Sequence, residues 1–285
     1  MVADRFDVTS TEPAQRSKAE AFARLHGEDG PFVIPNPWDA GTARILQVLG
    51  FDALATTSGG LAAVLGKSDR NTEVTRDDTL ANATQIAAAT PLPVSVDLED
   101  GFGPTPRDVA ETITLTASTG AVGGSIEDFT GRREDPVRPF DESVERVAAA
   151  VEAARGLEFP FMVTARAENF LYGRNDLDDT VARLRAFAEV GADVVYAPAL
   201  PDAESIRRVC EAVDRPVNVL LGAGQGLTVS ELFDLGVRRV SLGSSLSRVA
   251  LGAFKRAATE LLEHGTHEFN HDALTMADMR ELMGK

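Results

Sequence analysis

Acidic side chains stand at the ends of several short apolar runs in this sequence. Asp97 and Glu99 end the run LPVSVDLE, and Glu127 ends the run AVGGSIED. Residues two apart on a strand face the same side of a sheet, so Asp97 and Glu99 are expected to point together, with Glu127 beside them on the adjacent strand. Three converging carboxylates are costly unless a cation neutralises them. Such oxygen ligands favour Mg²⁺, or alternatively Mn²⁺, over zinc.

The alternative is that carboxylates at these positions pair with arginine or cap helices. Asp100, Asp128 and Glu168 are interpreted in that way. Zinc is disfavoured further because all four histidines, at positions 26, 264, 267 and 271, lie outside the ends of the apolar runs. The trio Asp97, Glu99 and Glu127 is therefore the predicted metal site.

One arginine and one glycine-rich turn accompany these acids. Arg166 ends the run PFMVTARAE, where it would neutralise the acids, bind a substrate carboxylate, or do both. Ser58, Gly59 and Gly60 follow the run FDALATTS and can offer a hydroxyl and backbone N–H groups to an anionic oxygen, although a simple tight turn explains them equally well. Other runs end in polar or aromatic side chains, namely Asn36, Trp38, Tyr196, Asn218 and Ser241.

A second glycine-rich region lies near the carboxyl end of the alternating pattern. The segment 222–226 reads GAGQG, and Gly243 is followed by two serines. In a barrel of alternating strands and helices, the loops after the last two strands often bind phosphate. No lysine stands near these glycines, and a flexible loop accounts for them as well as a phosphate site does. Cys210 lies on a predicted helix face, which argues against a nucleophile.

The elements that must position these residues alternate regularly. Apolar, β-branched runs begin near residues 31, 51, 92, 121, 160, 192, 215 and 238, and stretches with helical spacing separate them. Helix starts are indicated at Thr75, at Thr228, and at Pro106, which follows Thr105. Glycines that allow a left-handed turn out of a helix precede three of the runs, at Gly50, Gly191 and Gly236.

Eight strand–helix units predict an α/β fold, a (β/α)8 TIM barrel. At roughly 30 residues per unit they occupy about 240 residues, the usual size of such a barrel. A doubly wound open sheet would have fewer strands and a glycine-rich dinucleotide turn after the first, where this chain has PNPWDAG. We expect one domain over residues 1–285, with the barrel at about 31–265, an extra amino-terminal helix and helices at the carboxyl end.

Composition narrows the classes of partner. The 285 residues include 28 Lys and Arg against 44 Asp and Glu, a formal net charge of −16. This balance repels phosphate backbones and anionic lipid surfaces, so neither nucleic acid nor membrane is expected as a partner. The start MVADRFDVTS has no apolar core, no stretch approaches about 18 apolar residues, and Cys210 is the only cysteine. These features predict a cytoplasmic protein.

Several ordered motifs resemble the isocitrate lyase/phosphoenolpyruvate mutase superfamily, and especially its smaller, phosphonomutase-like branch. The motifs are NPWDAGTARILQVLGFDALATTSGGLA, SVDLEDGFG, GGSIED, TARAENFL and NVLLGAGQGLTVSELFDLGVRRVSLGSS, spread over residues 31–250. The resemblance implies that Asp97 binds the metal, that Glu99 is its water-linked partner, and that Glu127 is the glutamate of the fourth strand.

The resemblance also implies roles outside the metal site. Ser58 and Gly59 correspond to the turn that holds the substrate carboxylate or keto oxygen, and Arg166 corresponds to the arginine of the fifth strand. Asp69 corresponds to a functional aspartate after the second strand. The implied chemistry is Mg²⁺-assisted: a 2-keto acid or its precursor binds the metal, and a C–C or P–C bond breaks or forms next to a stabilised enolate.

Departures from the family patterns narrow the activity. The lyases of isocitrate and methylisocitrate carry a K-K-C-G-H loop, but here the fourth strand leads into FTGRREDPVRPF. Phosphonomutases carry a K-x-N-S loop in that region and a histidine after the sixth strand, where Pro198 stands. Arg132 and Arg133 in this loop would bind a second substrate anion or, as we favour, are simply solvated.

The predicted function is that of a Mg²⁺-dependent enzyme of small 2-keto or 2-hydroxy carboxylic acids that cleaves a C–C bond as a lyase or decarboxylase. The first alternative is a P–C bond hydrolase or phosphonomutase of phosphonopyruvate type. The second is a non-catalytic barrel that retains the metal site. Relatives assemble through their carboxyl-terminal helices, and the apolar spacing of VALGAFKRAATELL is compatible with a homo-oligomer, a tetramer or a dimer.

Overall fold

Eight short parallel strands form the centre of the computed structural model, which describes residues 11–27, 29–69, 73–132, 134–224 and 226–283. Each of the eight predicted runs contains one strand, so the predicted strand count is confirmed. The strands are β1 (Phe32–Ile34), β2 (Leu54–Ala55), β3 (Val94–Asp97), β4 (Gly123–Glu127), β5 (Met162–Arg166), β6 (Val194–Tyr196), β7 (Val217–Leu220) and β8 (Arg239–Ser241).

The strands follow one another around the sheet in chain order. The hydrogen-bonded order is β1-β8-β7-β6-β5-β4-β3-β2, so the first strand lies beside the last. In register, Phe32 of β1 pairs with Arg239 of β8. Between β1 and β2 the ring is joined by the Ala55 N–H, which donates to the Pro35 carbonyl at 3.1 Å. An open doubly wound sheet would not bring the first strand back to the last, so the TIM barrel is confirmed.

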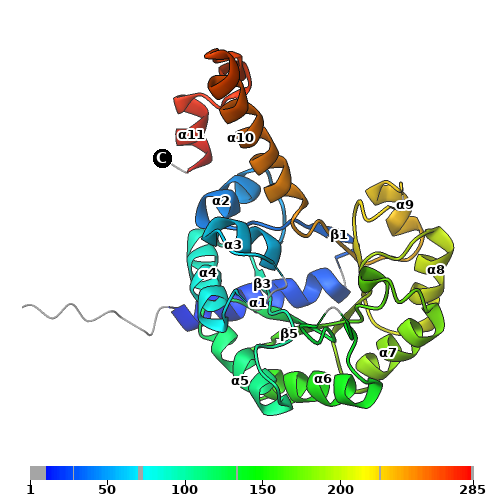
Figure 1. The fold of residues 1–285 in the computed structure, drawn as a ribbon. Helices are drawn as coiled ribbons and strands as arrows, with labels where there is room; N and C mark the ends of the chain where they lie inside the picture. The colour runs from blue at the N-terminus through cyan, green and yellow to red at the C-terminus, as the bar shows by residue number, and fades with distance from the viewer. Residues whose placement is uncertain (1–10, 28, 70–72, 133, 225, 284–285) are drawn as a thin grey trace, which may run out of the picture.

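Helices surround the strands as an outer layer (Figure 1). Their predicted starts are confirmed: Thr75, Thr105 and Thr228 each form a reciprocal capping box, and Pro106 opens its helix. The helices that lead up to and around the ring are α1 (Thr11–Gly27), α2 (Ala40–Val48), α3 (Ser58–Leu65), α4 (Arg76–Ala89), α5 (Pro106–Ala117), α6 (Phe140–Arg155), η2 (Phe170–Tyr172), α7 (Leu177–Glu189), α8 (Ala203–Ala212) and α9 (Val229–Asp234).

The amino-terminal helix α1 covers the end of the barrel at which the strands begin. Ala19 and Phe22 of α1 are fully buried and pack against Phe32, Val122 and Met162. Phe32 and Met162 are the first residues of β1 and β5. The apolar face of α1 therefore caps this end, which leaves the opposite end, where the strands finish, as the mouth.

The carboxyl-terminal helices extend away from the ring (Figure 1). They are α10 (Ser245–His264), η3 (Glu268–Asp272) and α11 (Met276–Leu282), as predicted. Three apolar side chains of α10 are largely exposed: Val249 at 68%, Phe254 at 72% and Leu262 at 86%. None of the helices in the described part of the chain is long and apolar enough to cross a membrane.

Candidate active site at the barrel mouth

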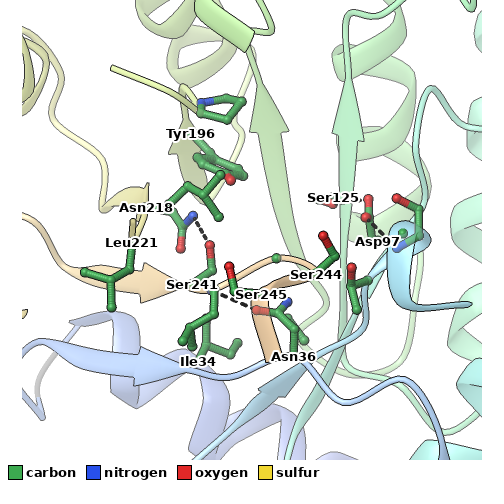
Figure 2. Close-up of a pocket in the computed structure, with 18 of the residues that line it drawn as sticks. Ile34, Asn36, Asp97, Ser125, Tyr196, Asn218, Leu221, Ser241, Ser244 and Ser245 are labelled. Carbon is green, nitrogen blue, oxygen red and sulfur yellow. Dashed lines mark hydrogen bonds between the residues drawn. The ribbon is translucent and has the colours of Figure 1, made fainter. Parts of the chain in front are cut away.

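A cavity of about 380 Å³ opens at the mouth of the barrel. Figure 2 shows Asp97 and Ser125 on one side of it and Asn218 and Ser241 on the other. Six of the predicted site residues line it: Ser58, Gly59, Asp69, Asp97, Arg166 and Asn218. The convergence of segments up to 160 residues apart in the chain follows from the parallel barrel, which brings all eight strand ends to one edge.

Asp97 joins the ends of β2 and β3. Its Oδ2 accepts the Ser58 N–H at 3.0 Å, and its own backbone N–H donates to Thr56 Oγ1 at 2.9 Å. Thr57 caps α3, so the Ser-Gly-Gly turn is the first turn of that helix and not a separate loop. The carboxylate of Asp97 is thereby held at the helix terminus with its other oxygen directed to Arg166.

Arg166 lies at the centre of a buried group of carboxylates. Its Nη1 lies 2.9 Å from Asp97 Oδ1, its Nη2 lies 2.8 Å from Glu127 Oε2, and its Nε lies 2.9 Å from Glu168 Oε1. Burial alone would lower the pKa of Arg166, but the three carboxylates raise it well above its ordinary value. Burial, with the nearby carboxylates, raises the pKa of Glu127 well above its ordinary value despite the charge of Arg166. Arg166 is the counter-ion of this crowded group of acids.

The expectation that Asp97 and Glu99 share one face of a strand is wrong. Strand β3 ends at Asp97, and Glu99 adopts a left-handed conformation with φ of 48°. The side-chain period of two does not extend past the end of the strand. Burial and the neighbouring carboxylates of Asp97, Asp69 and Asp100 raise the pKa of Glu99 to about 8. Glu99 therefore belongs to the acidic cluster but is positioned by a turn.

The predicted metal ligands do not all face the cavity. Asp97 lines it, whereas Glu127 is buried against Arg166, and Glu99 is not among the lining residues. Within the ranges that the structure describes, no three acidic, histidine or cysteine side chains already stand close enough to hold a metal ion. The donor chemistry nevertheless fits a hard divalent cation, because Asp69, Asp97, Glu99 and Asp100 repel one another and offer only oxygen.

Trp38 and Gly60 pack against each other behind the cavity wall. A Cβ added to Gly60 would lie 2.8 Å from Trp38 Cβ, so only glycine fits at this contact. The Trp38 carbonyl accepts a hydrogen bond from Asn82 Nδ2 at 2.9 Å. Neither Trp38 nor Gly60 lines the cavity, so a direct contact of either residue with a substrate gains no support from the geometry.

Three acids expected to be structural do form ion pairs. Asp100 lies 2.7 Å from Arg138, Asp128 lies 3.0 Å from Arg183, and Glu168 pairs with Arg166 as described. The pair of Asp128 with Arg183 attaches the end of β4 to the outer helix α7, and the pair of Asp100 with Arg138 links the loops that follow β3 and β4.

The sequence analysis also considered the loop arginines Arg132 and Arg133 and the cysteine Cys210, which do not line the cavity. In the loop after β4, Arg132 pairs with Asp135 at 3.2 Å, and both are exposed, whereas Arg133 lies outside the described residues. Burial raises the pKa of Cys210 to about 12, and Cys210 does not line the cavity, so its rejection as a nucleophile holds.

Two arginines that the sequence analysis did not single out line the same cavity. Arg239, only 5% exposed, donates to Asn218 Oδ1 at 2.8 Å and to Thr164 Oγ1 at 3.0 Å, and lies 3.1 Å from His26 Nε2. Burial lowers its pKa to about 10. A charged residue inside the apolar strand RRVSL was a signal for Arg239. Arg248 is exposed on α10, and no sequence pattern marked it.

Comparison with known proteins settles the family. The phosphoenolpyruvate phosphomutase model matches residues 22–262, which is most of the chain and includes every strand. The chain belongs to this family. It is thus a member of the phosphoenolpyruvate mutase/isocitrate lyase superfamily, as the sequence motifs predicted.

Named relatives within the family include lyases. A crystal structure from Burkholderia cenocepacia J2315, provisionally assigned as a lyase/mutase, is 54% identical, covers 96% of this chain and 98% of that one, and has a TM-score of 0.92. The 2-methylisocitrate lyase of Salmonella typhimurium is 29% identical over 88% of this chain and 87% of its own length. The crystal structure of 2,3-dimethylmalate lyase is 28% identical, with a TM-score of 0.83, and covers 95% and 94% of the two chains.

Proposed function

We propose that this barrel is a lyase or decarboxylase that cleaves a C–C bond in a small 2-keto or 2-hydroxy carboxylic acid. The observation that carries the proposal is the cavity at the strand ends, in which Asp97 of β3, Arg166 of β5 and Ser58 of the first turn of α3 meet. The lyase relatives belong to the same family and align along nearly the whole chain. Both relatives are named as lyases of small carboxylic acids, which supports the same reaction class here.

Asp97 is proposed to hold Mg²⁺, with Glu99 and Glu127 as further carboxylates of the acidic cluster. A bound Mg²⁺ would supply a Lewis acid that lowers the energy of the negative charge developing on the substrate during cleavage. Its positive charge would also reduce the repulsion among the carboxylates that surround Arg166. Mn²⁺ has the same ligand preferences and could replace it.

The first turn of α3 is proposed to orient the acid end of the substrate. The Ser58 hydroxyl and the Gly59 N–H line the cavity, and no hydrogen-bond partner for them lies in the described part of the chain. Donors that are fixed before the substrate binds stabilise negative charge without the cost of reorganisation. Asp69 lies beside this turn, since its Oδ2 would be 3.1 Å from a Cβ at Gly59. We assign Asp69 to proton transfer or to metal-bound water.

The proposal is tested by measuring pyruvate or glyoxylate release, with and without EDTA, over oxaloacetate, substituted malates, 2-methylisocitrate and phosphonopyruvate. EDTA-sensitive turnover of a carboxylate substrate is the expected result. Turnover of phosphonopyruvate alone would replace the proposal with P–C bond hydrolysis. A folded, Mg²⁺-loaded protein that turns over none of these acids would contradict the lyase assignment and support a barrel without catalysis.

A second copy of this chain is proposed to cover the exposed apolar side chains of α10. Val249, Phe254 and Leu262 are each more than two-thirds exposed. Monomers rarely leave several large apolar side chains of one helix in water. Light scattering should give a dimer or tetramer for the native chain, and Phe254→Asp combined with Leu262→Asp should give a monomer. A native chain that is monomeric at all concentrations tested would contradict this assembly.

A further inference from the structure

Residues 99–103, which follow β3 and include Glu99, form a turn with an unfavourable backbone conformation. Glu99 and Phe102 have φ of 48° and 57°, and they are two of the three non-glycine residues with a positive φ in the described part of the chain. A side chain makes this left-handed region unfavourable. Contacts from neighbouring elements must therefore hold the turn, and backbone strain of this kind gathers at functional sites.

The conformation of this turn determines where Glu99 points. The Gly101 N–H donates to the Leu98 carbonyl at 2.8 Å, which closes the turn. With φ at 48°, the backbone N–H of Glu99 is directed to Asp97 Oδ1, at 3.4 Å. The side chain of Glu99 lies within the acidic cluster around Asp97. A change in the turn would therefore move a carboxylate away from the proposed cation site.

Arg146 of α6 holds the backbone of the turn. Its Nη2 donates to the Asp100 carbonyl at 2.6 Å and to the Gly103 carbonyl at 2.8 Å, and these two carbonyls bracket Phe102. Arg146 is only 1% exposed, so water does not compete for the two hydrogen bonds. The side chain of Asp100 is held separately, by Arg138 at 2.7 Å. Arg146 therefore fixes the main chain of the turn, and Arg138 fixes its acidic side chain.

The other donors of Arg146 have no partners. Its Nε and Nη1 are buried, and no hydrogen-bond acceptor in the described part of the chain meets them. The carboxylate of Asp100 lies 3.8 Å from Nη2, which is longer than a hydrogen bond. Burial of unpartnered donors on a cation lowers the stability of a fold. The presence of Arg146 is therefore better explained by what its two hydrogen bonds do to the turn.

We propose that Arg146 is a positioning residue for the divalent cation, because its hydrogen bonds keep the turn 99–103 in the form that directs Glu99 to Asp97. The inference rests on the proposed function, since it concerns the same cation site. Arg146 does not line the cavity, so it acts through the turn and touches neither cation nor substrate. Residues that orient metal ligands in this way typically contribute about 10- to 100-fold to metal affinity.

The test measures the affinity for Mn²⁺, from the electron paramagnetic resonance signal of the free ion, in the native chain, Arg146→Met and Arg146→Lys. Arg238→Met is the matched control. Arg238 also donates to a backbone carbonyl, that of Leu25, and also has a buried nitrogen without a partner in the described residues. It lies at the end of the barrel that α1 covers, just before β8. Circular dichroism and the melting temperature show whether each variant is folded.

Arg146→Met should raise the Kd for Mn²⁺ by about 10- to 100-fold. Arg146→Lys should lie between this variant and the native chain, because a lysine ammonium can donate to a carbonyl but lacks the fixed geometry of the guanidinium. Arg238→Met should leave the Kd unchanged. For an acid that the protein turns over, the Mg²⁺ concentration that gives half-maximal activity should rise by the same factor as the Kd.

Two results would overturn the inference. One is the native Mn²⁺ affinity in Arg146→Met or, if that variant does not fold, in Arg146→Lys. The other is an equal loss of affinity in Arg238→Met, which would assign the effect to a general loss of stability. If the native chain binds Mn²⁺ but turns over no acid, the proposed function fails while the Mn²⁺ affinities still decide the role of Arg146. A native chain that binds no Mn²⁺ would contradict both.

Discussion

The two walls of the cavity each contain a buried arginine, but the partners of these two arginines differ in charge. On the acidic wall, formed by the ends of β3, β4 and β5, Arg166 is paired with three carboxylates and the group retains negative charge. On the amide wall, formed by β7 and β8, Arg239 has only neutral partners such as Asn218. The comparison shows that negative charge gathers on one wall and a carboxylate-free arginine lies on the other, a division that suits the proposed metal-assisted enzyme of acids.

The largest expected difference between the walls is in the free energy of unfolding that is lost when each buried arginine is replaced by methionine. Arg166→Met leaves three buried carboxylates without a counter-ion and should lower the free energy of unfolding by about 3–5 kcal/mol at pH 8. Arg239→Met removes a buried cation that has no carboxylate partner and should cost about 1 kcal/mol or less. Urea denaturation of both variants measures the difference. Equal losses would show that the two arginines are stabilised alike and would remove the contrast.

Removing one carboxylate from the acidic wall should lower the activity of the enzyme without lowering the stability of the fold. Asp97→Asn keeps the size of the side chain but weakens the metal site, so turnover should fall by about 100-fold or more. The substitution removes one of the three carboxylates that crowd Arg166 and leaves Arg166 paired with the other two, so the melting temperature should stay the same or rise. Asp135→Asn, at an exposed loop position, is the control. Full activity in Asp97→Asn would refute the metal assignment.

His26, next to Arg239 of the amide wall, should make the free energy of unfolding depend on pH. Burial, and next the charge of Arg239, lower the pKa of His26 from 6.5 to about 3. Because the unfolded chain binds a proton below pH 6.5 and the folded chain does not until about pH 3, this histidine leaves stability unchanged above pH 6.5 and reduces it as the pH falls. The reduction is about 1.4 kcal/mol per pH unit.

Urea titrations at pH 7.5 and pH 5.0 test this contribution. The native chain should lose about 2 kcal/mol more between the two pH values than His26→Gln does. The comparison uses the change between pH values, so the packing of His26 on Phe22 and Phe32, which the variant also loses, cancels. The same pH dependence in both proteins would mean that His26 is not held neutral in the fold.

The smallest effect is expected where the two walls meet, at Gly59. An added Cβ would lie 3.1 Å from Asp69 Oδ2 and 3.2 Å from Ser244 Cβ, so Gly59→Ala narrows the cavity at this contact. Activity should fall by about tenfold, the result of a small misplacement of the substrate, with little change in stability. Gly252→Ala is the matched control on α10, because its Cβ would meet only Arg256 Nη1, at 3.5 Å. Unchanged kcat/KM in Gly59→Ala would show that the turn does not contact the substrate.

Local patterns were enough to predict the elements of the barrel. Alternating apolar runs located all eight strands, the T-x-x-[DE] pattern located helix starts such as Thr75 and Thr228, and Gly50 and Gly191 do adopt positive φ, of 89° and 104°. These signals depend on residues a few positions apart, where side-chain periodicity and backbone hydrogen bonding act directly. The same patterns identified the acidic strand ends, because chain direction alone places them at one end of a barrel.

The relations between side chains depended on the tertiary structure. Sequence periodicity placed Glu99 beside Asp97, but the strand ends at Asp97 and a left-handed turn redirects Glu99. The role of Arg166 was ambiguous until the structure placed three carboxylates around it, from β3, β4 and the segment that follows β5. Arg248 gave no local signal at all, since its contact with the cavity arises only when α10 follows β8 across the mouth.

The sequence by itself determined the family, the strand–helix order and the acids at the strand ends, because these are properties of neighbouring residues. The closure of the barrel decided which charges are paired, which remain exposed to a ligand, and which arginine is buried without a carboxylate. Electrostatic energies depend on distance and burial, and both are set by side chains up to 213 residues apart in the chain, such as His26 and Arg239.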